Sequence, residues 1–278
     1  MKRIKSFDNS HPLLYLIAAP IGNLGEFSSR SIEVVNEMDL IAAEDTRNSA
    51  LLLSKFNIKK PMVSLREHNE VEASLNIIKQ IKEGKKVAYM SDAGYPGISD
   101  PGYILVKLAL ENDIAVSVIS GSTASINALV RSGLETSHFY FHGFLSSKEN
   151  EAKEELESLK NKKETLIFYE APHRIDKTLK IMLDVLGDRK ASLQRELTKL
   201  NEENIVGTLS ELVTLDSSTL KGEMVVVIEG KKEEEDNLEE YIKITQELIS
   251  KGLSKKDAIE FVSNTFKVRK NTLKDIIK

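Results

Sequence analysis

The feature of this sequence that most restricts its fold is the regular alternation of short apolar runs with stretches of helical period. Apolar runs bounded by turn residues predict strands, and apolar positions three and four apart predict helices. Because strands that alternate with helices form parallel β-α-β units, they should be buried on both faces. We therefore expect an α/β domain over residues 1–120. The predicted strands of this half are 13–19, 39–44, 86–91 and 115–120, and the predicted helices are 28–37, 49–56, 70–83, 101–112 and 122–132.

A second set of elements follows Phe144. The segment LSSKENEAKEELESLKNKKET predicts a highly charged helix that is solvated on most of its surface. Strands are predicted at 165–171, 191–198 and 223–230, a short strand and turn within 202–212, and helices at 176–186 and 208–215. These elements predict a second α/β domain with a mixed sheet over residues 121–232, and its boundary with the first domain falls between 115 and 145.

The end of the chain has a different composition. KKEEEDN (231–237) is typical of a charged linker. Beyond it, residues 238–278 predict a helix at 238–251, a second helix begun by Ser254 with Asp257 three residues on, and a third within 268–278. This tail holds eight Lys and one Arg against six acidic residues, so it is basic on a protein of formal net charge -4. It could bind RNA or a partner helix, although charge on short helices usually serves solvation alone.

Composition excludes several classes of site. With 278 residues and 41% hydrophobic content the chain can build real cores, but it has no cysteine and so no disulfide framework, thiolate nucleophile or cysteine-bound zinc. Its five histidines are not in metal spacing, so no metal is expected. The start imitates a signal peptide, but the apolar run 13–19 is short and leads into a glycine turn. No run is long enough to span a membrane, so we expect a cytoplasmic protein.

The loop SDAGYPGISDPG (91–102) is the strongest indication of a ligand site. It follows a predicted parallel strand, and open α/β sheets bind ligands at the carboxyl ends of such strands. It lacks both the lysine of a P-loop and the G-x-G-x-x-G pattern. Gly94 and Gly97 permit positive φ, whereas Pro96 and Pro101 fix φ and lower the ordering cost. We expect a rigid platform that presents backbone groups to a ligand.

Two carboxylates in this loop have alternative roles. Asp92 and Asp100 could accept hydrogen bonds from a ligand, or they could cap the turn and the following helix. Asp100 precedes Pro101, which suits an N-cap with proline at the first helical position. We favour that structural role for Asp100 and a binding role for the loop as a whole.

An ordered series of further motifs carries a family resemblance. The motifs are YLIAAPIGNLGE (15–26), AEDTR (43–47), REHNE (66–70), SDAGYPGISDPG (91–102), INALVRSGL (126–134), FHGFL (141–145), FYEAPHR (168–174), RELTK (195–199) and GEMVVVIEG (222–230). In this order the chain resembles the tetrapyrrole methylase family of S-adenosylmethionine enzymes, and within it a group that modifies ribosomal RNA. The resemblance covers about residues 13–230 and implies two α/β domains of the class III S-adenosylmethionine methyltransferase type.

The resemblance also implies a function. It indicates a homodimer that binds S-adenosyl-L-methionine between its two domains and methylates the 2′-hydroxyl of a cytidine ribose in the decoding region of 16S ribosomal RNA. The partner is the RNA itself or the small ribosomal subunit. Two alternatives stay open: a methyltransferase of the same fold that acts on a tetrapyrrole or a protein side chain, and a non-catalytic ribosome-assembly or RNA-binding relative.

Site residues are carried over from the same motifs. The implied cofactor-binding residues are Asp92, Gly94, Pro96, Gly97, Ile98, Ser99, Ser122, Thr123, Ala124, Tyr169, Glu170, Ala171, Glu223 and Met224. The implied substrate-binding residues are Gly22, Asn23, Thr46, Arg47, Arg174, Arg195 and Lys199. A ribose hydroxyl is a poor nucleophile and needs a proton acceptor nearby. The candidate bases are Asp45, Glu170 and Glu196.

Structural roles compete with some of these assignments. His68 and His173 could be bases, but a lone histidine near Arg or Glu is more often a satisfied polar contact. The EDTR segment could be a surface ion-pair cluster. Arg195 and Glu196 are adjacent on a predicted strand and should point to opposite faces, so at most one of them faces the cleft.

The sequence also departs from the family pattern. Ala19 stands where the family has threonine, Tyr95 replaces a threonine within the long loop, and the turn 120–123 lacks the usual Pro-Gly-Pro. Fewer prolines predict a looser turn. An aromatic side chain at position 95 reshapes the pocket if it points inward and leaves it ordinary if it points outward.

Overall fold

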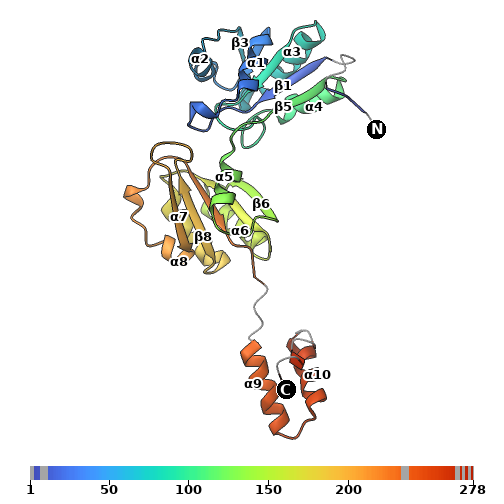
Figure 1. Ribbon diagram of the computed structural model, residues 1–278, viewed down its shortest axis with the longest axis vertical. Helices are drawn as coiled ribbons and strands as arrows, with labels where there is room; N and C mark the ends of the chain where they lie inside the picture. Colours follow the sequence, from blue (N-terminus) through green and yellow to red (C-terminus); the bar gives the residue numbers. More distant parts are fainter. Residues whose placement is uncertain are drawn as a thin grey trace. The chain divides into compact units, whose positions relative to one another are not determined.

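The computed structural model describes residues 3–6, 12–232, 238–266, 270, 273–274 and 277 of the chain (Figure 1). It divides into two compact units, one of residues Met1–Lys160 and Glu164–Glu229, the other of Asn161–Lys163 and Gly230–Lys278. The two predicted α/β domains fall in the first unit, apart from residues 161–163 and 230–232, which belong to the second. The exact domain bounds that we expected from the sequence stay a prediction.

The first sheet is fully parallel and has the order β3-β2-β4-β1-β5. Its strands are β1 (Leu13–Ile17), β2 (Leu40–Ala43), β3 (Met62–Ser64), β4 (Val87–Met90) and β5 (Ala115–Ile119). The helices are α1 (Ser29–Glu37), α2 (Thr46–Ser54), α3 (Glu70–Lys82) and α4 (Tyr103–Glu111), with short 3-10 turns η1 (Leu24–Glu26) and η2 (Glu67–Asn69). The predicted elements are confirmed. β3 was not predicted because it has only 3 residues.

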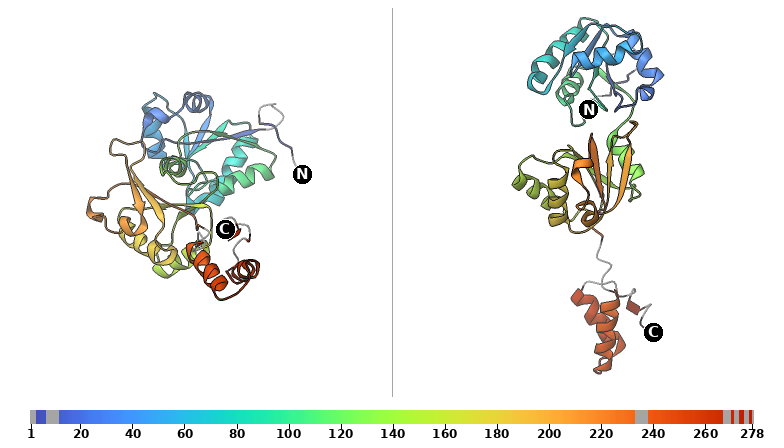
Figure 2. Two further views of the ribbon diagram at one scale, coloured as in Figure 1. Left: turned by 60° about the horizontal axis from the view of Figure 1, so that its bottom comes forward. Right: turned by 90° about the vertical axis from the view of Figure 1, so that its left-hand side faces the viewer.

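Burial on both faces explains the continuous apolar runs. Along β1, Leu14 and Leu16 join the core under α3 and α4, whereas Tyr15 and Ile17 join the core under α1 and α2. Helices therefore flank the sheet on both sides (Figure 2). Each fully buried Leu or Ile side chain contributes about 1.5–3 kcal/mol to folding.

The second sheet is mixed and has the order β6-β7-β10-β8-β9. β6 and β7 are parallel, and β10 is antiparallel to β7 and β8. Its elements are α5 (Ala124–Arg131), β6 (Phe139–Phe144), α6 (Glu149–Leu159), β7 (Thr165–Glu170), α7 (Ile175–Leu186), β8 (Lys190–Arg195), β9 (Glu203–Thr208), α8 (Leu209–Leu212), η3 (Ser217–Thr219) and β10 (Met224–Ile228). The mixed sheet is confirmed. β6 was not predicted, because its residues were interpreted only as the FHGFL motif.

The two faces of this sheet pack against different helices. Ile167 and Val225 point toward α5, and Phe168 and Val226 point toward α6 and α7. Packing on α5 matters for the site, because this helix begins directly after the turn that follows β5.

The second unit is a small helical body. Its helices are α9 (Leu238–Ser250) and α10 (Lys255–Phe266), which pack through an apolar cluster and through the rings of Tyr241 and Phe266, 4.8 Å apart. The predicted cap of the second helix is confirmed: the Ser254 hydroxyl accepts the Asp257 N–H at 3.1 Å and donates to its carboxylate at 2.6 Å. Most of the predicted third helix and residues 233–237 of the predicted linker lie outside the described residues.

Among the described residues, no helix is long and apolar enough to cross a membrane. In the same part of the chain, no group of three or more His, Cys, Asp and Glu side chains could hold a metal ion.

Candidate functional site

The loop between β4 and α4 has the rigid backbone that its sequence predicts. Gly94 exchanges two hydrogen bonds with Ala19 at the end of the first strand, at 2.9 and 3.0 Å. Gly94 and Gly97 have φ of 67° and 82°, in the region that favours glycine. The Gly97 N–H donates to the Pro101 carbonyl at 3.0 Å, which closes the loop on itself. The platform is thus held by backbone contacts at both ends.

The expected N-cap role of Asp100 is wrong. Helix α4 begins at Tyr103 and its N-cap is Gly102. The Glu70 carboxylate accepts the Gly102 and Ile104 N–H groups at 2.8 and 3.0 Å, so Glu70 stabilises the start of the helix. Asp100 is partly buried instead, and burial, followed by the charges of Glu44 and Asp92, raises its pKa to about 7.

Asp92 connects the loop to the EDTR segment. Its carboxylate accepts the Asp45 N–H at 3.1 Å and the Asn48 amide at 2.7 Å. Its own N–H donates to the Glu44 carboxylate at 3.3 Å. This side chain therefore positions the segment after β2.

The turn 120–123 is held by side chains although it lacks prolines. The phenol oxygen of Tyr95 accepts the Gly121 N–H at 3.2 Å, and the Ser122 hydroxyl donates to the Glu26 carboxylate. A β-carbon at Gly121 would lie only 2.8 Å from that of Ala18, so only glycine allows this close approach. These contacts restrain the turn, and a turn looser than one with prolines stays a prediction.

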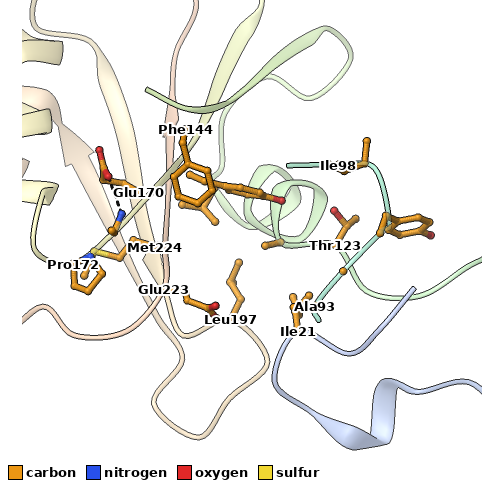
Figure 3. A pocket seen from close by; sticks show the side chains of 16 residues that line it. Ile21, Ala93, Ile98, Thr123, Phe144, Glu170, Pro172, Leu197, Glu223 and Met224 are labelled. Carbon is orange, nitrogen blue, oxygen red and sulfur yellow. Dashed lines mark hydrogen bonds between the residues drawn. The ribbon is translucent and has the colours of Figure 1, made fainter. Parts of the chain in front are cut away.

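A cavity of about 250 Å³ lies between this loop, the start of α5 and the ends of β6, β7 and β10. Figure 3 shows Phe144 and Met224 on one side and Ile98 and Thr123 on the other. The rings of Phe144 and Tyr169 meet edge to face with centroids 5.5 Å apart. Apolar walls with a few polar groups are typical of small-molecule sites.

Many residues of the predicted cofactor set line this cavity. They are Gly94, Ile98, Thr123, Ala124, Tyr169, Glu170, Ala171, Glu223 and Met224. The other predicted members lie outside its lining: Asp92, Pro96, Gly97, Ser99 and Ser122. Their contacts indicate support of the loop and the turn. Ser99, with φ of 60°, faces the bulge of β6, where a β-carbon on Gly143 would lie 3.4 Å from its hydroxyl.

Sequence reasoning missed several lining residues: Ile21, Ala93, Tyr95, Phe144, Pro172, Leu197 and Val225. All of them lie within the motifs that carried the resemblance. The strict alternation of a strand and the position next to an assigned residue could have indicated some of them. Tyr95 is one of the lining residues, and its phenol oxygen is bound to the turn, so whether its ring reshapes the pocket stays a prediction.

Glu170 is the only predicted base whose residue lines the cavity in the described part of the chain, and its carboxylate is occupied. The residue is 2% exposed. The carboxylate accepts the Thr178 hydroxyl at 2.5 Å and the Ala171 N–H at 2.8 Å, and it lies 3.3 Å from the Arg174 guanidinium. This arrangement fixes the loop after β7.

Asp45 and Glu196 are also held by cations. The Asp45 carboxylate accepts two bonds from the Arg47 guanidinium and caps α2, and these contacts lower its pKa. Glu196 accepts the Glu223 N–H at 3.1 Å and the Lys199 ammonium at 2.9 Å, and the lysine bond lowers its pKa. Both carboxylates are therefore ionised at neutral pH.

The expectation that Arg195 and Glu196 alternate on one strand is wrong. β8 ends at Arg195, and Glu196 has φ of 51°. The chain turns there because the Glu196 N–H donates to the Glu223 carbonyl at 3.0 Å and its side chain reaches back to the same residue.

The predicted substrate residues fall into separate groups. Asn23 accepts the Gly25 N–H at 3.0 Å, and a β-carbon on Gly22 would lie 2.5 Å from the Lys199 side chain, so that lysine covers Gly22. Thr46 begins α2 beside Arg47. The cations are paired as follows: Arg47 with Asp45, Arg174 with Glu170, Arg195 with Glu203, and Lys199 with Glu196 and Glu223.

The two-sheet architecture recurs among solved structures. Among solved structures, diphthine synthase covers 79% of this chain and 90% of its own length with a TM-score of 0.61 at 17% identity. The methyltransferase CobJ covers 80% and 95% with a TM-score of 0.59 at 15% identity. At such identities the likeness establishes the fold.

The family follows from sequence comparison. The family model of the tetrapyrrole (corrin/porphyrin) methylases matches residues 13–213, and this chain belongs to that family. It is 42% identical over 270 residues to the ribosomal RNA small subunit methyltransferase I of Bacillus subtilis, covering 94% of this chain and 92% of the relative. The protein of the same name from Haemophilus influenzae is 42% identical over 268 residues, with 94% of both chains covered.

Proposed function

We propose that this protein transfers a methyl group from S-adenosyl-L-methionine to the 2′-hydroxyl of a cytidine ribose in the decoding region of 16S ribosomal RNA. The observation that carries the proposal is the cavity at the loop 91–102, in a chain 42% identical to relatives named as small subunit rRNA methyltransferases. The family resemblance also supports a homodimer located in the cytoplasm.

The cavity lining fits this methyl donor. Phe144, Tyr169 and Met224 offer apolar and aromatic surface to a flat adenine ring. The backbone of Gly94 can approach a ligand closely because glycine has no side chain. When bound, S-adenosylmethionine would supply a methyl group whose bond to a positively charged sulfur breaks as the hydroxyl oxygen bonds to the methyl carbon, and the sulfur would leave as a neutral thioether. The residues of this chain have to orient the two reactants and exclude water.

The ribose hydroxyl must also lose a proton. Asp45 and Glu196 stay candidate acceptors, since both are ionised and lie in motifs of the predicted substrate side. Glu170 supports the cavity wall in this proposal, because its carboxylate is buried and fully bonded. A positioned base contributes about 10²–10⁴-fold to such a transfer.

The test uses purified full-length protein, small ribosomal subunits and 16S RNA. Calorimetry should show binding of S-adenosylmethionine, and label from its methyl group should be recovered as 2′-O-methylcytidine. Label recovered on a protein of the subunit, or on a tetrapyrrole offered in a parallel reaction, would favour the alternative substrates. Folded protein that neither binds the donor nor transfers label would sink the enzyme proposal.

A further inference from the structure

A second cavity of about 290 Å³ lies beside the first. The same two segments of chain form walls of both cavities. Phe144 and Pro172 line the first, and the residues directly after them, Leu145 and His173, line the second. The two cavities lie on the two sides of these strand ends: the first reaches α5 at Ala124, and the second reaches α6 and α7 at Ala152 and Ile181.

The lining of the second cavity is rich in hydrogen-bond donors. Arg174, Lys177 and His173 face it together with the hydroxyl-bearing Ser146 and Ser147. The Arg174 guanidinium donates to the Leu145 and Ser146 carbonyls, both at 2.9 Å, which fixes one wall against the other. Lys177 is 61% exposed at its side chain, so it can reach a ligand without a change of fold.

Two helices begin at this cavity. α6 has 11 residues and α7 has 12, and neither Lys148 nor Arg174, their N-caps, provides a side-chain acceptor. N–H groups in the first turn of a helix, together with its dipole, favour an anion. The N-termini of α6 and α7 and the cations Arg174 and Lys177 therefore surround the second cavity.

Two carboxylates oppose this charge: Glu149 in the described lining, and Glu170 behind it, which lies 3.3 Å from the Arg174 guanidinium. Glu149 accepts the Lys153 ammonium at 2.9 Å and the Lys177 ammonium at 3.0 Å. Two lysines share this one acceptor, so a second anion would complete their pairing. A ligand with several acceptor oxygens and a negative charge suits the cavity better than a nucleobase, which also needs acceptors from the protein.

We propose that the second cavity binds a phosphodiester group of the RNA, the phosphate next to the ribose that is methylated. The proposal rests on the proposed function. A ribose 2′-hydroxyl and its own 3′-phosphate are carried on adjacent carbons, so their sites on a protein must also be adjacent. The strand ends at Phe144–Leu145 and Pro172–His173 contribute to both linings, so the RNA backbone would pass over these ends from one cavity to the other.

Three variants test the assignment. Lys177→Ala removes a cation of the cavity and should weaken binding of a 16S RNA fragment about tenfold, the effect of one hydrogen bond to a charged group. The slope of the logarithm of RNA affinity against the logarithm of salt concentration should become less steep by about 0.7, the contribution of one contact to a single-strand phosphate. Glu149→Gln should strengthen binding, because it releases both lysines. Lys160→Ala is the matched control, since this lysine is also exposed and paired, to Glu157 at 3.3 Å, at the other end of α6.

RNA binding is measured directly by filter retention, and donor affinity by calorimetry without RNA. Weaker binding in Lys177→Ala and tighter binding in Glu149→Gln, with donor affinity and the control unchanged, support the phosphate site. Equal RNA affinity in all four proteins, or a wild type that binds no RNA, overturns it. Methyl transfer by the same preparations separates the two proposals: the expected binding pattern without transfer supports the cavity and rejects the proposed function.

Discussion

The Tyr95 phenol oxygen accepts a hydrogen bond from the Gly121 N–H at 3.2 Å and so connects the loop after β4 to the turn after β5. Tyr95 is among the residues that line the cavity of the proposed donor site, and the turn leads into Thr123 and Ala124, which also line it. A side chain thus provides the restraint that prolines would give to the turn. The conformation of the turn 120–123 therefore depends on Tyr95 of the loop 91–102.

Tyr95→Phe should weaken binding of S-adenosylmethionine about fivefold while the fold is kept. The change removes one hydrogen bond to a backbone N–H, which is worth about 1 kcal/mol. Calorimetry measures the affinity, and Tyr103→Phe is the control, since Tyr103 is 71% exposed and does not line the cavity. Equal affinity in both variants would show that the turn does not depend on this bond.

Gly97→Val should abolish donor binding and leave most of the fold intact. A β-carbon at Gly97 has room, with its nearest neighbours at 3.8 and 3.9 Å, but φ of 82° is strained for valine. The loop should relax away from this conformation, because the left-handed region costs about 1–2 kcal/mol for a residue with a side chain. Calorimetry with the donor and thermal unfolding measure the two effects.

Gly84→Val serves as the matched control for that change. Gly84 has φ of 95° and open space around it, at the end of α3. The Gly84→Val variant should be destabilised to a similar extent as Gly97→Val, but it should bind the donor with the affinity of the wild type. Loss of donor binding in both variants would assign the effect to general destabilisation.

Asp100→Asn should stabilise the protein at pH 8 and have little effect at pH 4. Burial, then Glu44 and Asp92, raises the pKa of Asp100 to about 7, so the native state keeps a proton that the unfolded chain releases near pH 4. Stability from this group is full below pH 4 and is lost as pH rises toward 7. Asparagine avoids the charge, with a gain of about 1 kcal/mol after solvent screening of a partly exposed group. Urea unfolding at both pH values checks the difference, and an equal shift at both would contradict it.

The elements of the fold were predictable where burial sets the pattern. β1 and β4 are buried on both faces, so their sequences are continuous apolar runs. β3 and β6 were not predicted, because they become strands by pairing with a neighbour. β3 is short, and β6 has a bulge between Phe141 and Gly143. A strand that depends on its partner carries little signal of its own.

The candidate site was predictable as motifs and not as contacts. The positive φ of Gly94 and Gly97 followed from composition. The capping of α4 by Glu70 did not, because Glu70 and Gly102 are distant in sequence and a nearer carboxylate, Asp100, had the usual N-cap position. Charge pairs such as Arg195 with Glu203 likewise depend on how β8 and β9 align.

Glu170→Gln separates a supporting role from a catalytic one. The carboxylate is buried and bonded to Thr178, the Ala171 N–H and Arg174, so the substitution should cost about 3 kcal/mol in the free energy of unfolding by leaving the guanidinium without its charge partner. Glu203→Gln is the control, because it breaks the half-exposed pair with Arg195 and should cost below about 1 kcal/mol. Guanidinium unfolding measures both. If Glu170→Gln unfolds like the wild type but no longer transfers methyl groups, the residue acts on the reaction itself, and the proton acceptor should be sought there instead of at Asp45 or Glu196.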